Sequence, residues 1–109
     1  MTAQITQPAC LPEAIERIVR HFDPLRIILF GSWARGDAHL DSDIDLLVVL
    51  PQVENKRHAM VEIMRALNGL PASKDVLVTT PDEIRRRGDL VGDVLRPALR
   101  EGKVVYERA

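Results

Sequence analysis

The run from Asp43 to Leu50 constrains the fold more than any other stretch of the sequence. It predicts a strand whose two faces are both apolar beyond Asp45. Side chains alternate along a strand, so Asp43 and Asp45 share one face with Leu47, and the opposite face is apolar throughout. A strand of this kind is buried on both sides, in a sheet that carries helices. The two aspartates are therefore expected where the strand enters the core.

The other elements follow from the spacing of apolar residues and from the glycines and prolines between them. Their order is α-β-(short α)-β-α-β-α-α-β, with helices at 12–22, 32–35, about 60–67, from Thr80 onward and 90–99, and strands at 26–30, 43–50, 75–79 and 103–106. Pro97 predicts a kink or a break in the last helix. The expected fold class is α/β (α+β), a small mixed β-sheet packed with helices, in one domain over residues 1–109.

Composition and charge exclude several classes of protein. Hydrophobic residues make up 46% of the chain and charged residues 28%, as in ordinary soluble domains. No apolar run is long enough to cross a membrane and the N-terminus does not look like a signal peptide, so no membrane partner is expected and the cytoplasm is the expected location. The formal charge of −1 indicates no broad basic surface, so direct nucleic-acid binding is not expected.

The aspartate pair predicts a site for a hard divalent cation. Carboxylates as close as Asp43 and Asp45 on a partly buried strand repel each other unless a cation compensates, and without His or Cys neighbours they suit Mg²⁺ or Mn²⁺. The alternative is a solvated acidic face, which does not explain why the same face becomes apolar further along. A calcium-binding loop is excluded, because its glycine and glutamate positions hold Leu46 and Gln52.

Gly31 and Ser32 predict a phosphate-binding turn, because they join a strand to the start of a short helix. The first N–H groups of a helix are unpaired, and glycine lets the backbone come close to a ligand. A P-loop is excluded, since Asp37 and Ala38 occupy its lysine and hydroxyl positions. Such turns are common, and this one becomes informative because the aspartate strand follows it. The fold would bring turn and carboxylates together as adjacent strand ends.

The combined pattern resembles the nucleotidyltransferase superfamily that includes DNA polymerase beta, in which a Gly-Ser turn, a spacer and Asp-x-Asp follow one another. Gly31-Ser32 and Asp43-Ile44-Asp45-Leu46 match this pattern without a gap. The chain is most similar to the smallest members, the MNT-type nucleotidyltransferases, over essentially its whole length. Its ending at 101–106 is similar to theirs as well.

The resemblance implies a site and a reaction. Asp43 and Asp45 would hold two Mg²⁺ ions, and Gly31 and Ser32 would bind the β- and γ-phosphates of ATP. Asp75 matches the third carboxylate of the superfamily, although from the residues alone it is only an acid at the start of a strand. It would join the metal site and help to deprotonate the acceptor hydroxyl. AMP would pass to the acceptor and pyrophosphate would leave.

Some residues keep two interpretations at this point. Arg35 is either a further contact for the nucleotide phosphates or a solvated helix residue. Met60 and Met64 are expected in the core, with a partner interface as the alternative. The Arg85-Arg86-Arg87 run is expected to be a solvated face.

The resemblance also implies a partner, since MNT proteins of this size are similar to the antitoxins of HEPN/MNT toxin–antitoxin pairs. The chain would transfer AMP from ATP to a tyrosine of a HEPN-family toxin and so neutralise it. Larger relatives carry a helical domain that closes over the nucleotide, so a partner or a second copy of the chain (a homo-oligomer) is expected to complete the pocket here. The alternatives are a non-catalytic antitoxin that masks a HEPN ribonuclease, and a small-molecule adenylyltransferase of the aminoglycoside type.

Overall fold

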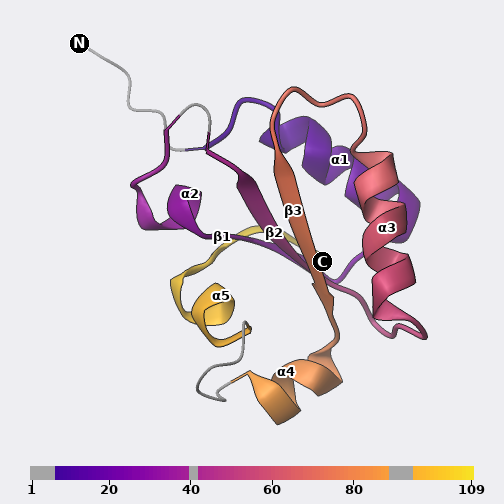
Figure 1. Ribbon diagram of the computed structural model, residues 1–109. Coiled ribbons are helices and arrows are strands. Elements are labelled where there is room, and N and C mark those ends of the chain that lie inside the picture. Colours follow the sequence, from indigo (N-terminus) through magenta and orange to yellow (C-terminus); the bar gives the residue numbers. More distant parts are fainter. Residues whose placement is uncertain (1–6, 40–41, 89–94) are drawn as a thin grey trace.

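The computed structural model describes residues 7–39, 42–88 and 95–109, and its elements follow the order expected from the sequence (Figure 1). The helices are α1 (Leu11–Phe22), α2 (Ser32–Arg35), α3 (Lys56–Ala66), α4 (Pro81–Arg87) and α5 (Leu95–Glu101). The strands are β1 (Arg26–Phe30), β2 (Ile44–Val49), β3 (Lys74–Thr79) and β4 (Lys103–Glu107). In the described ranges no helix is both long and apolar enough to span a bilayer.

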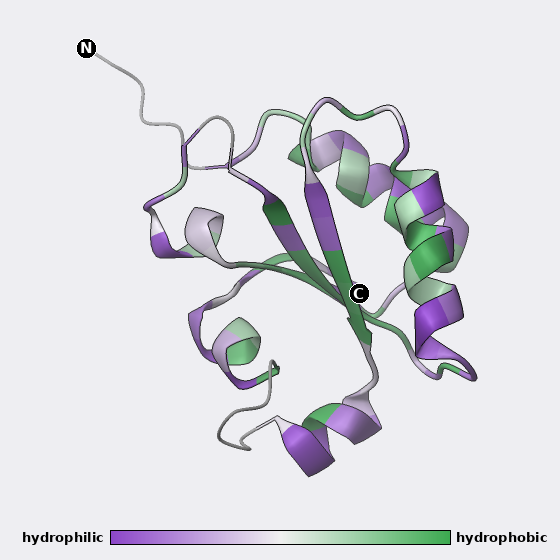
Figure 2. Ribbon diagram, in the orientation of Figure 1, coloured by the Kyte–Doolittle hydropathy of each residue, from purple (hydrophilic) through white to green (hydrophobic). Residues whose placement is uncertain are grey.

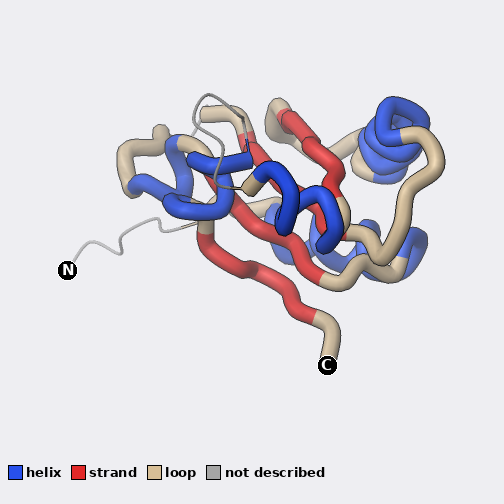
Figure 3. Tube along the Cα trace, turned by 90° about the horizontal axis from the view of Figure 1, so that it is seen from below, coloured by secondary structure: helices blue, strands red, loops and turns tan. Residues whose placement is uncertain are grey.

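The strands form one mixed sheet in the order β3-β2-β1-β4. β1 runs antiparallel to β2 and to β4, whereas β2 and β3 are parallel and are joined through α3. Seen from below, the strands make a single layer with helices on both sides, and β4 leads to the C-terminus at its outer side (Figure 3). β2 lies between β1 and β3, which is the interior position that its two apolar faces predict. β3 and β4 are the outer strands.

Each face of the sheet has its own hydrophobic core. The core under α1 and α3 contains Ile18 and Ile63 together with Leu46, and the core under α5 contains Ala98 together with Leu47. All five side chains are at least 98% buried. Hydropathy colouring shows the strands as mostly hydrophobic, with hydrophilic segments near the starts of β2 and β3 (Figure 2). The hydrophilic segments of β2 and β3 therefore lie together at one end of these two strands, which are otherwise mostly apolar.

The structure differs from the sequence-based expectations at several element ends. β2 begins at Ile44, so Asp43 immediately precedes the strand. α3 begins at Lys56, because the side chain of Asn55 accepts a hydrogen bond from the backbone N–H of His58 and caps the helix there. Of the kink or break expected at Pro97, the break was wrong, since α5 continues through Pro97 from Leu95 to Glu101. The apolar stripe expected over 90–94 lies outside the described residues.

The two methionines of α3 differ in their surroundings. Met60 is partly buried and packs against the core below α3, as expected. Met64 is 37% exposed, so its placement in the core was wrong. The helical spacing identified the correct element, but Met64 lies on the side of the helix that no other described element covers.

Candidate functional site

The predicted site lies where β1 ends and where β2 and β3 begin. Phe30, the last residue of β1, pairs with Asp45 in the antiparallel ladder, and Gly31 follows it directly. Gly31 has φ 74° and ψ −151°, which residues with a Cβ rarely adopt. A Cβ built on Gly31 would overlap Oδ2 of Asp45. The absence of a side chain at Gly31 therefore lets the turn lie directly against this carboxylate, as the sequence predicted.

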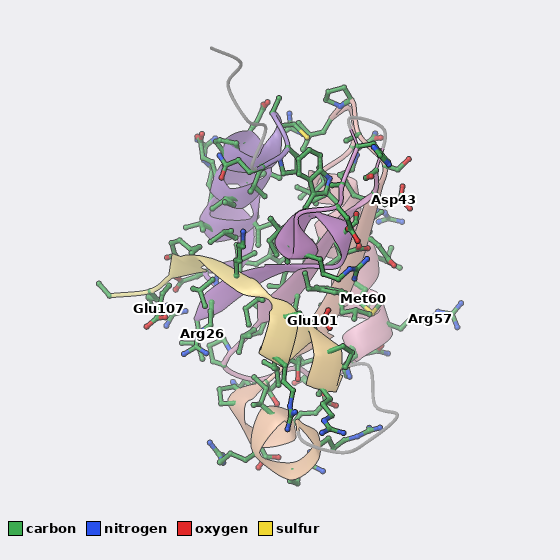
Figure 4. All side chains as sticks on the ribbon, turned by 90° about the vertical axis from the view of Figure 1, so that its left-hand side faces the viewer. Arg26, Asp43, Arg57, Met60, Glu101 and Glu107 are labelled. Carbon is green, nitrogen blue, oxygen red and sulfur yellow. The ribbon has the colours of Figure 1, made fainter. Side chains whose placement is uncertain are left out.

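Asp75 lies on the other side of Asp45. The two residues are register partners in the parallel ladder between β2 and β3, and neighbouring strands in a sheet are about 4.8 Å apart. Asp43 is exposed and precedes the same strand as Asp45. The fold thus brings the three predicted carboxylates to one end of the sheet, and Figure 4 shows Asp43 at that end.

The surroundings of Asp45 raise the pKa of its carboxyl above the ordinary value. Burial is the largest cause, followed by the negative charges of Asp75 and Asp43, while Arg35 acts in the opposite direction. None of the three aspartates forms an ion pair with a described lysine, arginine or histidine. The neighbouring Lys74 instead donates to the backbone oxygens of residues 70 and 72, at 3.2 and 2.7 Å. The carboxylates therefore carry negative charge that the described side chains only partly offset.

These carboxylates fit a divalent cation in chemistry and charge. Clustered oxygen donors with uncompensated negative charge are what Mg²⁺ binds in proteins. Within the described residues, however, no three His, Cys, Asp or Glu side chains converge closely enough to form a ready-made metal site. Asp43 and Asp45 with Asp75 are thus neighbours that a bound cation would have to draw together.

The turn after β1 is held by a short helix with a buried anchor. In α2 the N–H groups of Ser32 and Trp33 belong to the first turn, where a helix provides no acceptor. The Trp33 ring is buried in the core under α1 and α3, and its Nε1 donates to the Ser42 backbone oxygen at 3.4 Å. The same contact links α2 to the residues just before β2. The predicted phosphate turn is therefore fixed relative to the aspartates.

Arg35, at the end of α2, is the cation whose charge acts on Asp45. Its guanidinium lies 3.8 Å from Glu101 of α5 and 3.4 Å from Asp37. All three side chains are about half exposed, so these are surface ion pairs that a stronger anion can replace. Glu101, labelled in Figure 4, was not singled out from the sequence, because only the packing of α5 against β1 brings it to this end.

Two solved structures have the same fold. A candidate nucleotidyltransferase from Sulfolobus solfataricus is 26% identical, with a TM-score of 0.63 over 88% of this chain and 76% of that chain. A toxin–antitoxin structure with AMP-PNP is 23% identical, with a TM-score of 0.64 over 90% of this chain and 74% of that chain. At that identity the second likeness shows the fold alone. No curated protein matches the chain.

The fold and the first of these likenesses define a nucleotidyltransferase-type domain. The nucleotidyltransferase domain family matches residues 11–104, and the chain belongs to that family. The matched range includes α1 through the first part of β4, and with them every residue that the sequence predicted for the site.

Proposed function

We propose that this chain is a Mg²⁺-dependent adenylyltransferase that transfers AMP from ATP to a protein, and that it is the antitoxin of a HEPN-family toxin. One observation carries the enzymatic part of the proposal. Gly31 lies against Asp45, and Asp75 is the register partner of Asp45 on its other side. A close-approach turn and clustered carboxylates on neighbouring strands are what phosphoryl chemistry on a nucleotide requires.

The turn side of the site would hold the leaving group. The free N–H groups at the start of α2 and the hydroxyl of Ser32 donate to the β- and γ-phosphates, and Gly31 lets the phosphates come close. Arg35 exchanges its surface partners, Glu101 and Asp37, for a phosphate, since a guanidinium binds phosphate more strongly than it holds an exposed carboxylate.

The carboxylate side would hold the cation and the acceptor's proton. Asp43 and Asp45, with Asp75, are the residues that would bind Mg²⁺, and bound Mg²⁺ supplies positive charge that offsets the negative charge of the phosphates. Asp75 accepts the proton of the acceptor hydroxyl. The hydroxyl oxygen then forms a bond to the α-phosphorus, the bond to the β-phosphate oxygen breaks, and pyrophosphate leaves.

The partner part of the proposal is supported by the arrangement of the described elements and by resemblance. The described elements form one sheet with its covering helices and include no second layer that would close over a nucleotide. A partner, or a second copy of the chain, would complete the pocket. The similarity of the motifs to MNT antitoxins and of the fold to a toxin–antitoxin structure solved with AMP-PNP favours a toxin as this partner.

Coexpression with the protein encoded next to this chain tests the proposal. The neighbour's mass should rise by one or more AMP units when it is coexpressed with the wild-type chain, and should not rise with Asp43→Ala/Asp45→Ala. ATP with Mg²⁺ should also raise the melting temperature of the wild-type chain, alone or with its partner, but not that of the double variant.

The same experiment separates the alternatives. Neutralisation of the neighbour without any gain in mass, unchanged by Asp43→Ala/Asp45→Ala, would mean that the chain masks its partner sterically. Failure of ATP and Mg²⁺ to shift the melting temperature, with and without the partner, would reject the assignment of the nucleotide site.

A further inference from the structure

A groove between α3 and β3 opens beside the candidate site. It has a volume of about 530 Å³ and is called the α3–β3 groove below. Among the side chains that line it are Arg57, Met60, Val61, Met64 and Arg65 of α3 and Asp75 of β3. α3 and β3 lie side by side in Figure 1, and β3 is an outer strand, so no described strand closes this side of the groove.

The floor of the α3–β3 groove is apolar and accessible. Val61 is 44% and Met64 37% exposed, and among the described residues they belong to the few large hydrophobic side chains left exposed on the surface. Exposed apolar clusters with a polar rim are typical of protein–protein contacts, and methionine adapts its shape to different partners. The groove therefore has the character of a binding surface.

The order of the strands determines which of the two substrates, the nucleotide or the acceptor, lies on the side of this groove. In a displacement at phosphorus, the attacking hydroxyl and the leaving group lie on opposite sides of the phosphorus atom. Gly31 follows β1, on one side of Asp45, and Asp75 lies on β3, on the other side. With the phosphates at the Gly31 turn, the acceptor has to approach from the β3 edge of the sheet, where Asp75 lines the groove. Val76 turns toward α3 and Asp75 alternates to the other face, so the acceptor hydroxyl reaches Asp75 around this open edge. This step rests on the proposed function.

The charges along the groove indicate the chemistry of the acceptor. Arg57 and Arg65 lie eight residues apart on one helix, which separates them by about 12 Å along its axis. Arg57 extends outward from α3 in Figure 4. It forms no ion pair with a described residue. Arg65 is paired only at the surface, with Glu62 of its own helix. Two cations thus lie on either side of the apolar floor around Val61, at a spacing that about four residues of extended chain would span.

We propose that the α3–β3 groove binds the acceptor as a polypeptide segment, with an apolar side chain on the groove floor and carboxylates near Arg57 and Arg65. The segment presents its hydroxyl to Asp75 across the open edge of β3. A nucleic acid does not fit the same description, because its phosphates favour a continuous basic surface and the net charge of this chain is −1.

Selection from a random peptide library displayed on phage, with the full-length chain immobilised, tests this proposal and does not require the acceptor protein itself. We expect enriched peptides to combine apolar residues with Asp or Glu. Measured with fluorescein-labelled peptides, Arg57→Glu/Arg65→Glu should weaken binding at least about tenfold, which corresponds to about 1.4 kcal/mol. Peptides with Lys in place of their acidic residues should bind this variant better than the wild-type chain.

Matched variants elsewhere on the surface serve as controls. Val61→Glu should abolish peptide binding, whereas Val104→Glu should not, because Val104 is 53% exposed on β4 at the opposite edge of the sheet. Arg85→Glu/Arg86→Glu on α4 changes the charge by the same amount as the groove variant and should leave binding unchanged. The melting temperature of each variant shows that it has folded.

The proposal is wrong if the selected peptides bind Arg57→Glu/Arg65→Glu as tightly as wild type, if no peptide is enriched, or if basic peptides are selected. Binding of a fluorescent single-stranded RNA that is lost in Arg57→Glu/Arg65→Glu, without peptide binding, would replace the polypeptide by a nucleic acid. Peptide binding without any shift of the melting temperature by ATP and Mg²⁺ would instead reject the proposed function and retain the groove as a protein-binding surface.

Discussion

Replacing Gly31 by alanine tests the close contact that holds the turn against a carboxylate. The backbone of Gly31, at φ 74° and ψ −151°, is strained for any residue with a Cβ, at about 1–3 kcal/mol. The added methyl group also overlaps Asp45 Oδ2, and displacing this side chain adds about 1 kcal/mol. We expect Gly31→Ala to lower the free energy of unfolding by about 3 kcal/mol and, at about 4 °C per kcal/mol, the melting temperature by about 12 °C.

A double-mutant cycle in urea separates the two contributions. With Asp45→Ala the carboxylate is gone and only its Cβ remains, at 3.4 Å from the added carbon, an ordinary contact. Gly31→Ala should therefore destabilise the Asp45→Ala chain by about 1 kcal/mol less than it destabilises wild type. Gly36→Ala is the control, because Gly36 also has a positive φ, of 86°, but no atom lies within 4 Å of an added Cβ.

The result that refutes this reasoning is a cost of Gly31→Ala that is the same in both backgrounds within about 0.5 kcal/mol, the usual limit of additivity for independent sites. In that case Gly31 and Asp45 do not meet. The turn would then not lie against the carboxylate, and the central observation behind the proposed nucleotide site would be lost.

Other predictions concern charge and packing, and urea denaturation in EDTA measures each. Burial and the neighbouring aspartates raise the pKa of Asp45 in the folded chain, so its ionised form destabilises the fold. This loss of stability is absent at a pH below 3.8, the pKa in the unfolded chain, and is complete at a pH above the raised pKa in the folded chain. Asp45→Asn should therefore be more stable than wild type at pH 7, by up to about 1 kcal/mol after solvent screening, and equally stable at pH 3. Equal stability at both pH values would contradict this. Burial raises the pKa of Glu83, but hydrogen bonds from Thr79 and Lys56 outweigh it, so the net pKa is lowered below 4.5. The ionised Glu83 therefore stabilises the fold fully above pH 4.5, and this stabilisation is lost as the pH falls through the lowered pKa of the folded chain. Glu83→Gln should lower the free energy of unfolding by about 1 kcal/mol at pH 7 and make it less dependent on pH in acid. If the free energy of unfolding of Glu83→Gln falls with acid as steeply as that of wild type, these hydrogen bonds do not stabilise the fold. Gly102→Ala should cost about 1–3 kcal/mol, because its methyl group would overlap a backbone oxygen and a core side chain, and a neutral effect would show that α5 can shift.

The sequence predicted those parts of the fold that depend on local pattern. The two apolar faces of the Asp43–Leu50 run required an interior strand, and β2 is one. The meeting of Gly31 with Asp45 was predicted because a turn and an acid at the ends of neighbouring strands have to lie close together. Asp75, by contrast, depended on the resemblance to a family, since an acid at the start of a strand has no pattern of its own.

What the sequence could not predict depends on which element covers which surface. Helical spacing placed Met64 on an apolar stripe, but its exposure follows from β3 being an outer strand, which only the strand order decides. The ion pair between Arg35 and Glu101 joins residues far apart in the chain through the packing of α5. Its residues give no sign of the pairing in the sequence. The α3–β3 groove escaped prediction for the same reason.

The register between β2 and β3 has a consequence for which length changes the chain can tolerate. Asp75 faces Asp45 only because Val76 and Val78 turn into the core under α3, and alternation then directs Asp75 to the opposite face. A residue inserted at the exposed Asn68-Gly69 turn leaves this alternation intact. A residue inserted between Asp75 and Val76 would direct either the acid or the valines to the wrong face. Insertions a few positions apart should therefore differ sharply in their effect on stability. An insertion in the turn before β3 should be tolerated, whereas an insertion within β3 should destabilise the fold.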